Sequence, residues 1–301
     1  MKRVVGISLG SSKRDHSVEL ELLNTRCRVE RIGTDGDLSK MISFIKENDG
    51  HVDAFGLGGM DRYIYAVNRR YELRDAQKIA RAARKTPIVD GSGLKNTLER
   101  MAIKQVAEQT GLFINNPRVL LMSAMDRLGM AESLDEEGCE LIYGDCLFAL
   151  GVPVPLRNLK SLAVLARILV PVIRLLPFSM LYPTGSKQDV NKPKYPGYFR
   201  RADIIAGDFH FIKRYMPAEL PGKTIITNTV TTDDLNFLRK RGVEKLITTT
   251  PELEGRSFGT NIMEAILICL SGSDRELTAE KYHEMLKVLD IRPRIVDLTQ
   301  E

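Results

Sequence analysis

The chain has 301 residues, more than a single hydrophobic core usually holds, so we expect two domains of ordinary size. Hydrophobic residues make up 43% of the chain and charged residues 28%, which is typical of a folded globular protein and excludes a disordered one. The net charge of +5 comes from 44 basic residues interspersed with 39 acidic ones. This charge slightly favours a small anionic substrate and gives no support to a nucleic-acid partner.

The four cysteines, Cys27, Cys139, Cys146 and Cys269, are scattered along the chain. They form no Cys-x-x-Cys pair and have no histidine at metal-ligand spacing, so we predict reduced, buried thiols and no metal site. The N-terminus passes from a basic dipeptide directly into a strand-like run, without the apolar stretch of a signal peptide. These features together predict a cytoplasmic protein.

The first third of the chain alternates between strand and helix patterns. Residues 4–9 form an apolar run that ends at a glycine turn, and residues 52–57 form another. Helical spacing of apolar residues lies between these runs at 38–48 and follows them at 76–83, where Asp75 would cap the helix. We predict an N-terminal α/β substrate domain over residues 1–112, in which the turn Gly10-Ser11-Ser12-Lys13-Arg14 could hold an anion although it lacks the phosphate-loop spelling.

The remainder of the chain has a more regular alternation. Short apolar strands are separated by amphipathic helices, which is the pattern of a parallel sheet that is buried on both faces. The predicted strands are 119–123, 140–143, 203–206, 224–227 and 245–249, and the predicted helices are 125–137, 233–241 and 261–270. We therefore predict the fold class as α/β, with a second domain over residues 113–301 that is a Rossmann-like doubly wound parallel sheet.

An apolar insertion at residues 152–183 interrupts this second domain. Its four basic residues, Arg157, Lys160, Arg167 and Arg174, leave no charge-free stretch of membrane-spanning length, so we predict no transmembrane segment. On a helix these four side chains fall in one narrow sector and leave a strongly apolar face. We predict that this face is buried against the body of the protein or against a twin subunit in a homodimer.

The turn after the strand at 119–122 is the candidate dinucleotide site. A Rossmann-like domain binds the pyrophosphate with backbone amides at this turn, and an acid after the second strand binds the ribose. Residues 123–131 and Asp145 have the required placement, but Gly129 is the only glycine and Met125 and Asp126 are bulkier than the usual residues. An ordinary strand-helix-strand unit that binds nothing is the alternative interpretation.

Two later stretches resemble a known family. Ala202-Asp203-Ile204-Ile205-Ala206, followed by Leu220-Pro221-Gly222-Lys223, is similar to the nicotinamide-binding domains of shikimate and quinate dehydrogenases and of methylenetetrahydrofolate dehydrogenases. Gly93-Leu94-Lys95-Asn96-Thr97 resembles the Asn-Thr-Asp-Gly segment of shikimate dehydrogenases, and the whole chain looks like bacterial proteins labelled quinate 5-dehydrogenase. The resemblance implies an NAD(P)-dependent alcohol dehydrogenase with NAD or NADP as cofactor. The predicted cofactor-binding residues are Ser123, Ala124, Asp126, Arg127, Leu128, Gly129, Asp145, Thr227 and Asn228.

The expected catalytic acid of that family is missing, because Leu98 stands where its Asp belongs. Hydride transfer needs a group that exchanges the hydroxyl proton, and Lys95 with Asp90 is the closest substitute. A solvated lysine and an aspartate that orders its own turn are the alternative. The predicted substrate-binding residues are Asn96, Thr97, Arg256, Thr260 and Asn261, of which Arg256 would bind a carboxylate and Thr260 could instead only cap a helix.

Two further interpretations stay open. The missing glycines and the displaced acid would also fit a non-catalytic ligand-binding or regulatory protein on a degenerate dinucleotide-binding fold. Alternatively, the apolar insertion would suit an acyl-group reductase with a lipid-facing surface.

Overall fold

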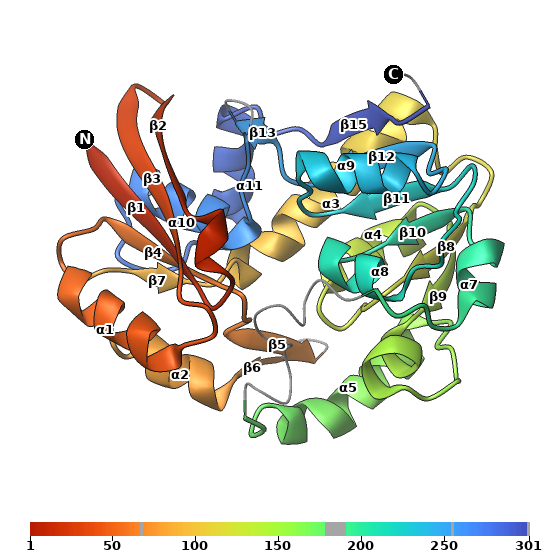
Figure 1. Cartoon of the computed structure of the whole chain (residues 1–301), viewed down its shortest axis with the longest axis horizontal. Coiled ribbons are helices and arrows are strands. Elements are labelled where there is room, and N and C mark those ends of the chain that lie inside the picture. Colours follow the sequence, from red (N-terminus) through yellow and green to blue (C-terminus); the bar gives the residue numbers. More distant parts are fainter. Residues whose placement is uncertain (67–68, 178–190, 254–255, 300–301) are drawn as a thin grey trace. The chain divides into compact units, whose positions relative to one another are not determined.

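A computed structural model of the chain describes residues 1–66, 69–177, 191–253 and 256–299. It confirms the predicted α/β class, because parallel sheets flanked by helices form both of its compact units (Figure 1). The first unit comprises residues 1–97, 168–188 and 259–290, and the second comprises 98–167, 189–258 and 291–301. Within the described ranges, no helix is both long and apolar enough to cross a membrane.

The first unit is built on a five-stranded sheet with the order β2-β3-β1-β4-β7. All neighbouring strands pair in parallel except β2 with β3. The strands are β1 (Lys2–Ser8), β2 (His16–Leu22), β3 (Thr25–Gly33), β4 (Ala54–Gly58) and β7 (Ile88–Val89). The other elements of this unit are η1 (Ser12–Arg14), α1 (Leu38–Asn48), β5 (Tyr63–Ala66), β6 (Arg69–Glu72), α2 (Arg74–Ala80), α10 (Thr260–Ser271) and α11 (Ala279–Val288), together with the start of α3 (Ser92–Thr110).

Alternating residues of β1 and β4 send their side chains to opposite faces of this sheet. On one face, apolar side chains of both strands pack against α1 and α2 in a single core, which includes Val5, Ile7, Phe55, Met41 and Ile79. The residues between them include Gly6 and Gly56, and these glycines face α10. A Cβ on Gly56 would lie 2.6 Å from the backbone oxygen of Asn261, so the missing side chain lets α10 approach the sheet closely.

The second unit is built on a six-stranded sheet with the order β15-β12-β11-β10-β8-β9, parallel except for β15. The strands are β8 (Arg118–Leu121), β9 (Glu140–Tyr143), β10 (Ile204–Ala206), β11 (Thr224–Thr227), β12 (Lys245–Thr248) and β15 (Arg294–Asp297). Its other elements are α4 (Leu128–Glu136), η2 (Asp145–Leu150), α5 (Leu159–Ile173), α7 (Pro196–Arg201), α8 (Phe209–Tyr215), α9 (Thr232–Arg239), β13 (Glu252–Leu253) and β14 (Arg256–Ser257), together with most of α3.

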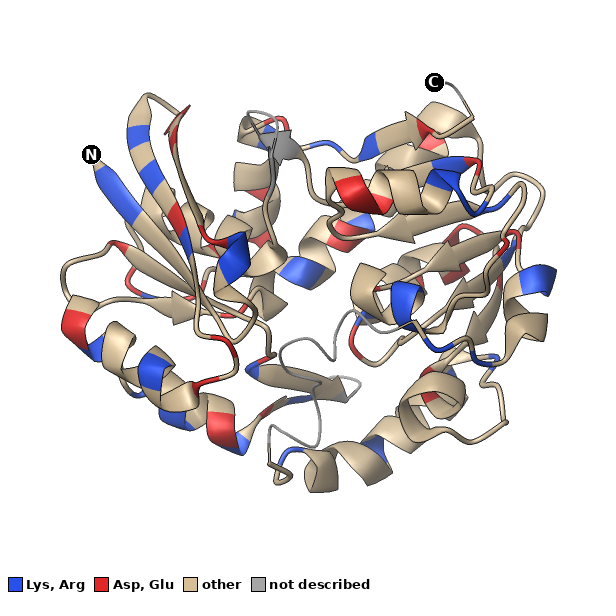
Figure 2. Cartoon of the chain, viewed as in Figure 1, with Lys and Arg blue, Asp and Glu red and all other residues tan. Residues whose placement is uncertain are grey.

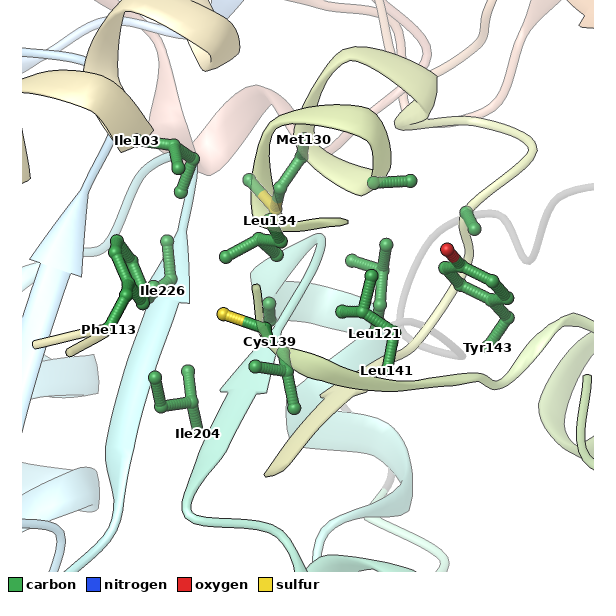
Figure 3. Close-up of a cluster of buried hydrophobic side chains, with 14 of the residues drawn as sticks. Ile103, Phe113, Leu121, Met130, Leu134, Cys139, Leu141, Tyr143, Ile204 and Ile226 are labelled. Atoms are coloured by element: carbon green, nitrogen blue, oxygen red, sulfur yellow. The ribbon is translucent and has the colours of Figure 1, made fainter. Parts of the chain in front are cut away.

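Both faces of this sheet are buried, as the apolar strands predicted. Val119 and Leu121 of β8 belong to a core with residues of α3 and α4, part of which Figure 3 shows. Leu120 of the same strand belongs to a second core with residues of α7, α8 and α9. The first strand, β8, has β9 on one side and β10 on the other. The carboxyl ends of β8 and β10 therefore flank the point where the strand order reverses, which is the usual ligand crevice of such sheets.

The division into units differs from the predicted boundary after residue 112. The chain changes unit within α3, and α10 and α11 pack with the N-terminal sheet although they follow β12 in sequence. The apolar insertion 152–183 forms α5, which contributes residues to both units, and residues 178–183 lie outside the described part of the chain. The interleaving arises because the glycines of β1 and β4 accept α10 from far along the chain.

Candidate functional site

The turn after β8 is closed by the side chain of Asp145. This carboxylate is fully buried and accepts hydrogen bonds from the backbone amides of Ala124 and Met125, each at 3.0 Å. Burial raises the pKa of Asp145 and the nearby Asp126 adds to the effect, although the backbone hydrogen bonds oppose it. Asp145 therefore accepts hydrogen bonds from the amides that the predicted site would offer to a pyrophosphate.

Arg127 lies next to this turn and is the central cation of the site. Its side chain is 3% exposed and forms an ion pair with the equally buried carboxylate of Glu99 on α3. A second nitrogen, Nη2, lies 3.4 Å from Oδ2 of Asp208, which follows β10. The guanidinium group therefore links the carboxyl ends of β8 and β10, at the crevice where the strand order reverses.

Asp208 presents a carboxylate that is fixed in place yet accessible. Its side chain is 33% exposed, and Nδ2 of Asn228 donates a hydrogen bond to it at 2.8 Å. Burial works against its charge, but His210, Arg127 and the hydrogen bond from Asn228 outweigh that effect and lower its pKa. Asn228 is oriented in turn, because its Oδ1 accepts from the backbone amide of Phe209. We call Arg127, Asp208 and Asn228 the polar triad.

The other predicted cofactor residues surround the polar triad in different roles. Ser123 Oγ lies 3.5 Å from Asp145, and the buried Thr227 donates to the backbone oxygen of Gly207. Gly129 is buried inside α4, and Leu128 packs against the core. Thr227 and Gly129 thus lack the accessible surface that a cofactor contact requires.

The predicted catalytic pair belongs to the first unit. Nζ of Lys95 lies 3.4 Å from Oδ1 of Asp61. The carboxylate of Asp90 accepts hydrogen bonds from the backbone amides of Arg62 and Tyr63 and from both the amide and the hydroxyl of Ser92. Asp90 therefore orders its own loop, as one half of the alternative had it, whereas the side chain of Lys95 is only 11% exposed and is not a solvated lysine.

The predicted substrate residues are divided between the two units. Asn96 and Thr97 lie on α3, and both are partly buried. Thr260 begins α10 and Asn261 lies against the carboxyl end of β4 beside Gly58, where both belong to the packing of the first unit. Arg256 begins β14 in the second unit, and its side chain lies outside the described part of the structure.

The sequence interpretation missed Asp208 and Glu99. Asp208 has a detectable signal, because Gly207-Asp208 follows a buried strand directly and an aspartate at this point also caps the next helix. Glu99 has none, since a charged residue in an amphipathic helix is usually solvated. In the described residues we find no group of three or more His, Cys, Asp or Glu side chains that could hold a metal ion.

Comparisons with known proteins give two family matches. The model of a family described as Domain of unknown function (DUF8754) matches residues 93–298, and that of Domain of unknown function (DUF8753) matches residues 3–90. The comparison with curated proteins finds no match.

Several solved structures are similar to this chain at low identity. An ABC transporter solute-binding protein from Agrobacterium vitis with bound allitol is 10% identical, at 99% coverage of this chain and 95% of that chain, with a TM-score of 0.40. A carbohydrate transporter solute-binding protein from Agrobacterium radiobacter with D-arabinose is also 10% identical, with the same coverages and a TM-score of 0.37. The NAD-dependent malic enzyme from Thermotoga maritima is 12% identical, at 96% and 84% coverage, with a TM-score of 0.37.

These findings correct the predicted function. Sugar-binding proteins of transporters recur among the matched structures where quinate or shikimate dehydrogenases were expected. Within the chain itself, Asp145 occupies the amides of the dinucleotide turn. The prediction of an NAD(P)-dependent oxidoreductase of the quinate and shikimate type is therefore wrong.

Proposed function

We propose that this chain, which belongs to the family described as Domain of unknown function (DUF8754), is a non-catalytic binding protein for a small polyhydroxylated ligand. The observation that carries the proposal is the polar triad at the carboxyl ends of β8, β10 and β11, where the partly exposed carboxylate of Asp208 is held by Arg127 and Asn228. This proposal corresponds to the alternative interpretation of the sequence, a non-catalytic ligand-binding protein on a degenerate dinucleotide-binding fold.

The chemistry of the polar triad suits hydroxyl groups. An ionised carboxylate accepts hydrogen bonds only, and an amide both donates and accepts, so the accessible Asp208 and Asn228 can satisfy hydroxyls that donate and accept, while the buried Arg127 holds Asp208 in place. Side chains already fixed by hydrogen bonds lose little conformational entropy when a ligand binds. The polar triad is therefore preorganised for a ligand with several hydroxyl groups.

The same site is unsuited to a dinucleotide. Arg127 lies among the carboxylates of Glu99, Asp126 and Asp208, so acidic groups outnumber the cation. A diphosphate would add negative charge to this environment, and like charges at short distance repel strongly where water is scarce. We propose that neither NAD nor NADP is a ligand.

Isothermal titration calorimetry of the purified chain tests this function. Allitol, D-arabinose, other pentoses, hexoses and sugar alcohols form the panel, with NAD and quinate as the contrasting ligands. We expect a saturable heat with at least one polyhydroxylated compound and none with NAD or quinate. Binding of NAD without any polyol binding would refute the proposal.

A matched pair of variants locates the site, because β10 has an aspartate near each end. Asp208→Asn removes the triad carboxylate, whereas Asp203→Asn removes the same charge near the amino end, where Asp203 pairs with Arg118. We expect Asp208→Asn to weaken binding about tenfold or more, as loss of a charge-assisted hydrogen bond does. Equal weakening by Asp203→Asn would show that the polar triad is not the site.

We also propose that the chain forms a cytoplasmic homodimer through α5. Val164, Ile168 and Val172 recur at four-residue spacing, and each is more than half exposed, whereas Leu162, Ala166 and Val170 are buried. An exposed apolar stripe of this kind favours association with a second copy. Light scattering should show a dimer that Ile168→Asp dissociates, and a monomeric parent would contradict this.

The four described cysteines are free buried thiols, in keeping with a reducing compartment.

A further inference from the structure

Two arginine side chains of the first unit converge on the turn that follows β1. Arg31 lies on β3, where it pairs in register with Gly6 of the neighbouring β1, and Arg14 ends the short helix η1. Figure 2 shows basic positions in blue along the strands of this sheet. A Cβ built on Gly10 would lie 2.9 Å from Nη2 of Arg14 and equally 2.9 Å from Nη2 of Arg31. The two nitrogens are thus separated by at most about 6 Å, a span that one oxyanion bridges with hydrogen bonds of ordinary length.

The nearby carboxylates have hydrogen-bond partners other than these two nitrogens. Asp15 accepts from Nη1 of Arg31 at 2.9 Å and from the backbone amide of Gly33 at 2.6 Å. Asp35 accepts from the amide and the hydroxyl of Ser12, both at 2.8 Å. Among the described residues, the side-chain hydrogen bonds of Arg31 come from Nη1, and Nη2 of neither arginine donates one.

Bringing two guanidinium groups together costs free energy unless a negative charge lies between them. The side chain of Arg31 is only 14% exposed. Its burial, and next the charge of Arg14, lower the pKa of Arg31, even though Asp15 and Asp35 partly compensate. A bound anion would relieve this repulsion, and planar guanidinium groups match the geometry of phosphate and carboxylate oxygens.

We propose that Arg14 and Arg31 bind a small oxyanion, a phosphate or carboxylate group, over Gly10 at the carboxyl end of β1. The site recognises the anion through side chains, because three amides of this turn already have partners: Gly10 donates to Ser8, Ser12 donates to Asp35, and Lys13 donates to Ser11. Its place matches the usual position of ligands at the carboxyl ends of parallel strands. It is independent of the polar triad, which belongs to the second unit.

Gly10→Ala is the most selective test, since it changes no charge. Gly10 is not among the described glycines with positive φ, so the backbone accepts alanine without strain. The new methyl group would occupy the meeting point of the two Nη2 atoms, which are the far ends of flexible side chains and can move apart. Gly197→Ala is the matched control, because a Cβ there meets nothing within 4 Å.

Calorimetric titration of the full chain with inorganic phosphate, and separately with acetate, provides the measurement. We expect saturable binding of at least one anion, which Gly10→Ala weakens tenfold or more, equivalent to about 1.4 kcal/mol. Gly197→Ala should bind the anion as the parent does. The proposal is overturned if the parent binds neither anion, if Gly10→Ala binds as tightly as the parent, or if Gly197→Ala loses binding equally.

A second pair of variants keeps the test decisive if Gly10→Ala fails to fold. Arg14→Gln and Arg26→Gln each remove one exposed positive charge from the first unit. Arg26 is the control, because it lies on β3 and forms only a loose ion pair with Glu19, at 3.7 Å. We expect Arg14→Gln to weaken anion binding tenfold and Arg26→Gln to leave it unchanged. Equal effects of the two changes would show a general attraction to positive charge and would refute a site at Gly10.

Discussion

Asp35 and Asp145 hold corresponding positions in the two units of this protein. Each follows the parallel strand that lies beside the first strand of its sheet, β3 for Asp35 and β9 for Asp145. Each accepts a hydrogen bond from a backbone amide in the turn after that first strand, Asp35 from Ser12 and Asp145 from Ala124 and Met125. In both turns, a carboxylate of the same unit therefore accepts hydrogen bonds from backbone amides. A nucleotide-binding sheet would offer these amides to phosphate.

The carboxylate of Asp145 in the second unit should contribute to the stability of the fold. Asp145→Ala removes the acceptor of two backbone amides, one of them in the fully buried Ala124, and leaves a small cavity. We expect the free energy of unfolding to fall by roughly 2–4 kcal/mol. Urea denaturation measures this, and Asp135→Ala on the exposed side of α4 should change it by no more than about 0.5 kcal/mol. Similar values for the two variants would contradict the structural role of Asp145.

The ion pair of Arg127 and Glu99 should be strongly coupled, because both side chains are almost fully buried. Arg127→Met removes the ion-pair partner of the buried Glu99 carboxylate and should lower the free energy of unfolding by roughly 3–5 kcal/mol. Adding Glu99→Leu removes that buried charge and should recover much of the loss.

The exposed ion pair of Arg118 and Asp203 provides the comparison for the buried pair of Arg127 and Glu99. Arg118→Met should cost no more than about 1 kcal/mol, as is usual for solvated pairs. A double-mutant cycle from urea denaturation gives the coupling of Arg127 with Glu99, and an additive cycle would rule out the buried interaction.

Local sequence patterns predicted individual elements well. The helix predicted at 38–48 has the bounds of α1, because its apolar spacing is regular and Asp37 caps its first turn. The strands β2 and β3 were missed, since their exposed positions carry Arg and Glu, and only alternate residues such as Cys27 and Val29 are buried. Alternation with a charged face was the signal that could have indicated them.

Side-chain direction and long-range packing could not be predicted in the same way. The sequence placed Asp145 and Arg127 beside the turn after β8. It did not show that the carboxylate of Asp145 points inward and accepts a hydrogen bond from a backbone amide of that turn. Arg127 in turn pairs with Glu99 and Asp208, which come from α3 and from the end of β10, and local sequence does not show these partners. Similarly, nothing local to α10 shows that it packs on glycines more than two hundred residues earlier in the chain.

The buried Glu264 of α10 should make stability depend on pH. Its carboxyl group accepts hydrogen bonds from the hydroxyl of Tyr282 and from the amide of Gly91. Burial, and next the charge of Asp90, raise its pKa from 4.5 to about 8. The folded protein therefore retains this proton up to about pH 8, whereas the unfolded chain releases it near pH 4.5. The free energy of unfolding should consequently decrease as the pH rises between these values.

Glu264→Gln keeps the shape of this side chain without its titration, so it should flatten that dependence. We expect the parent to lose roughly 2–4 kcal/mol more than the variant between pH 5 and pH 8. Urea denaturation across this range measures the difference, with the exposed Glu284→Gln of α11 as the control. Parallel pH profiles for the parent and Glu264→Gln would show that Glu264 is ionised in the folded protein.

The close approach of α10 to β4 should make Gly56 intolerant of any side chain. A Cβ at this position would lie 2.6 Å from the backbone oxygen of Asn261 and 3.0 Å from its carbonyl carbon, and neither atom can move without the helix. Gly56→Ala should therefore cost roughly 1–3 kcal/mol, which is several degrees in Tm. Gly197→Ala in α7 has open space around its Cβ and should leave Tm unchanged or raise it slightly. Differential scanning calorimetry distinguishes the two, and an unchanged Tm for Gly56→Ala would mean that α10 does not lie against this strand.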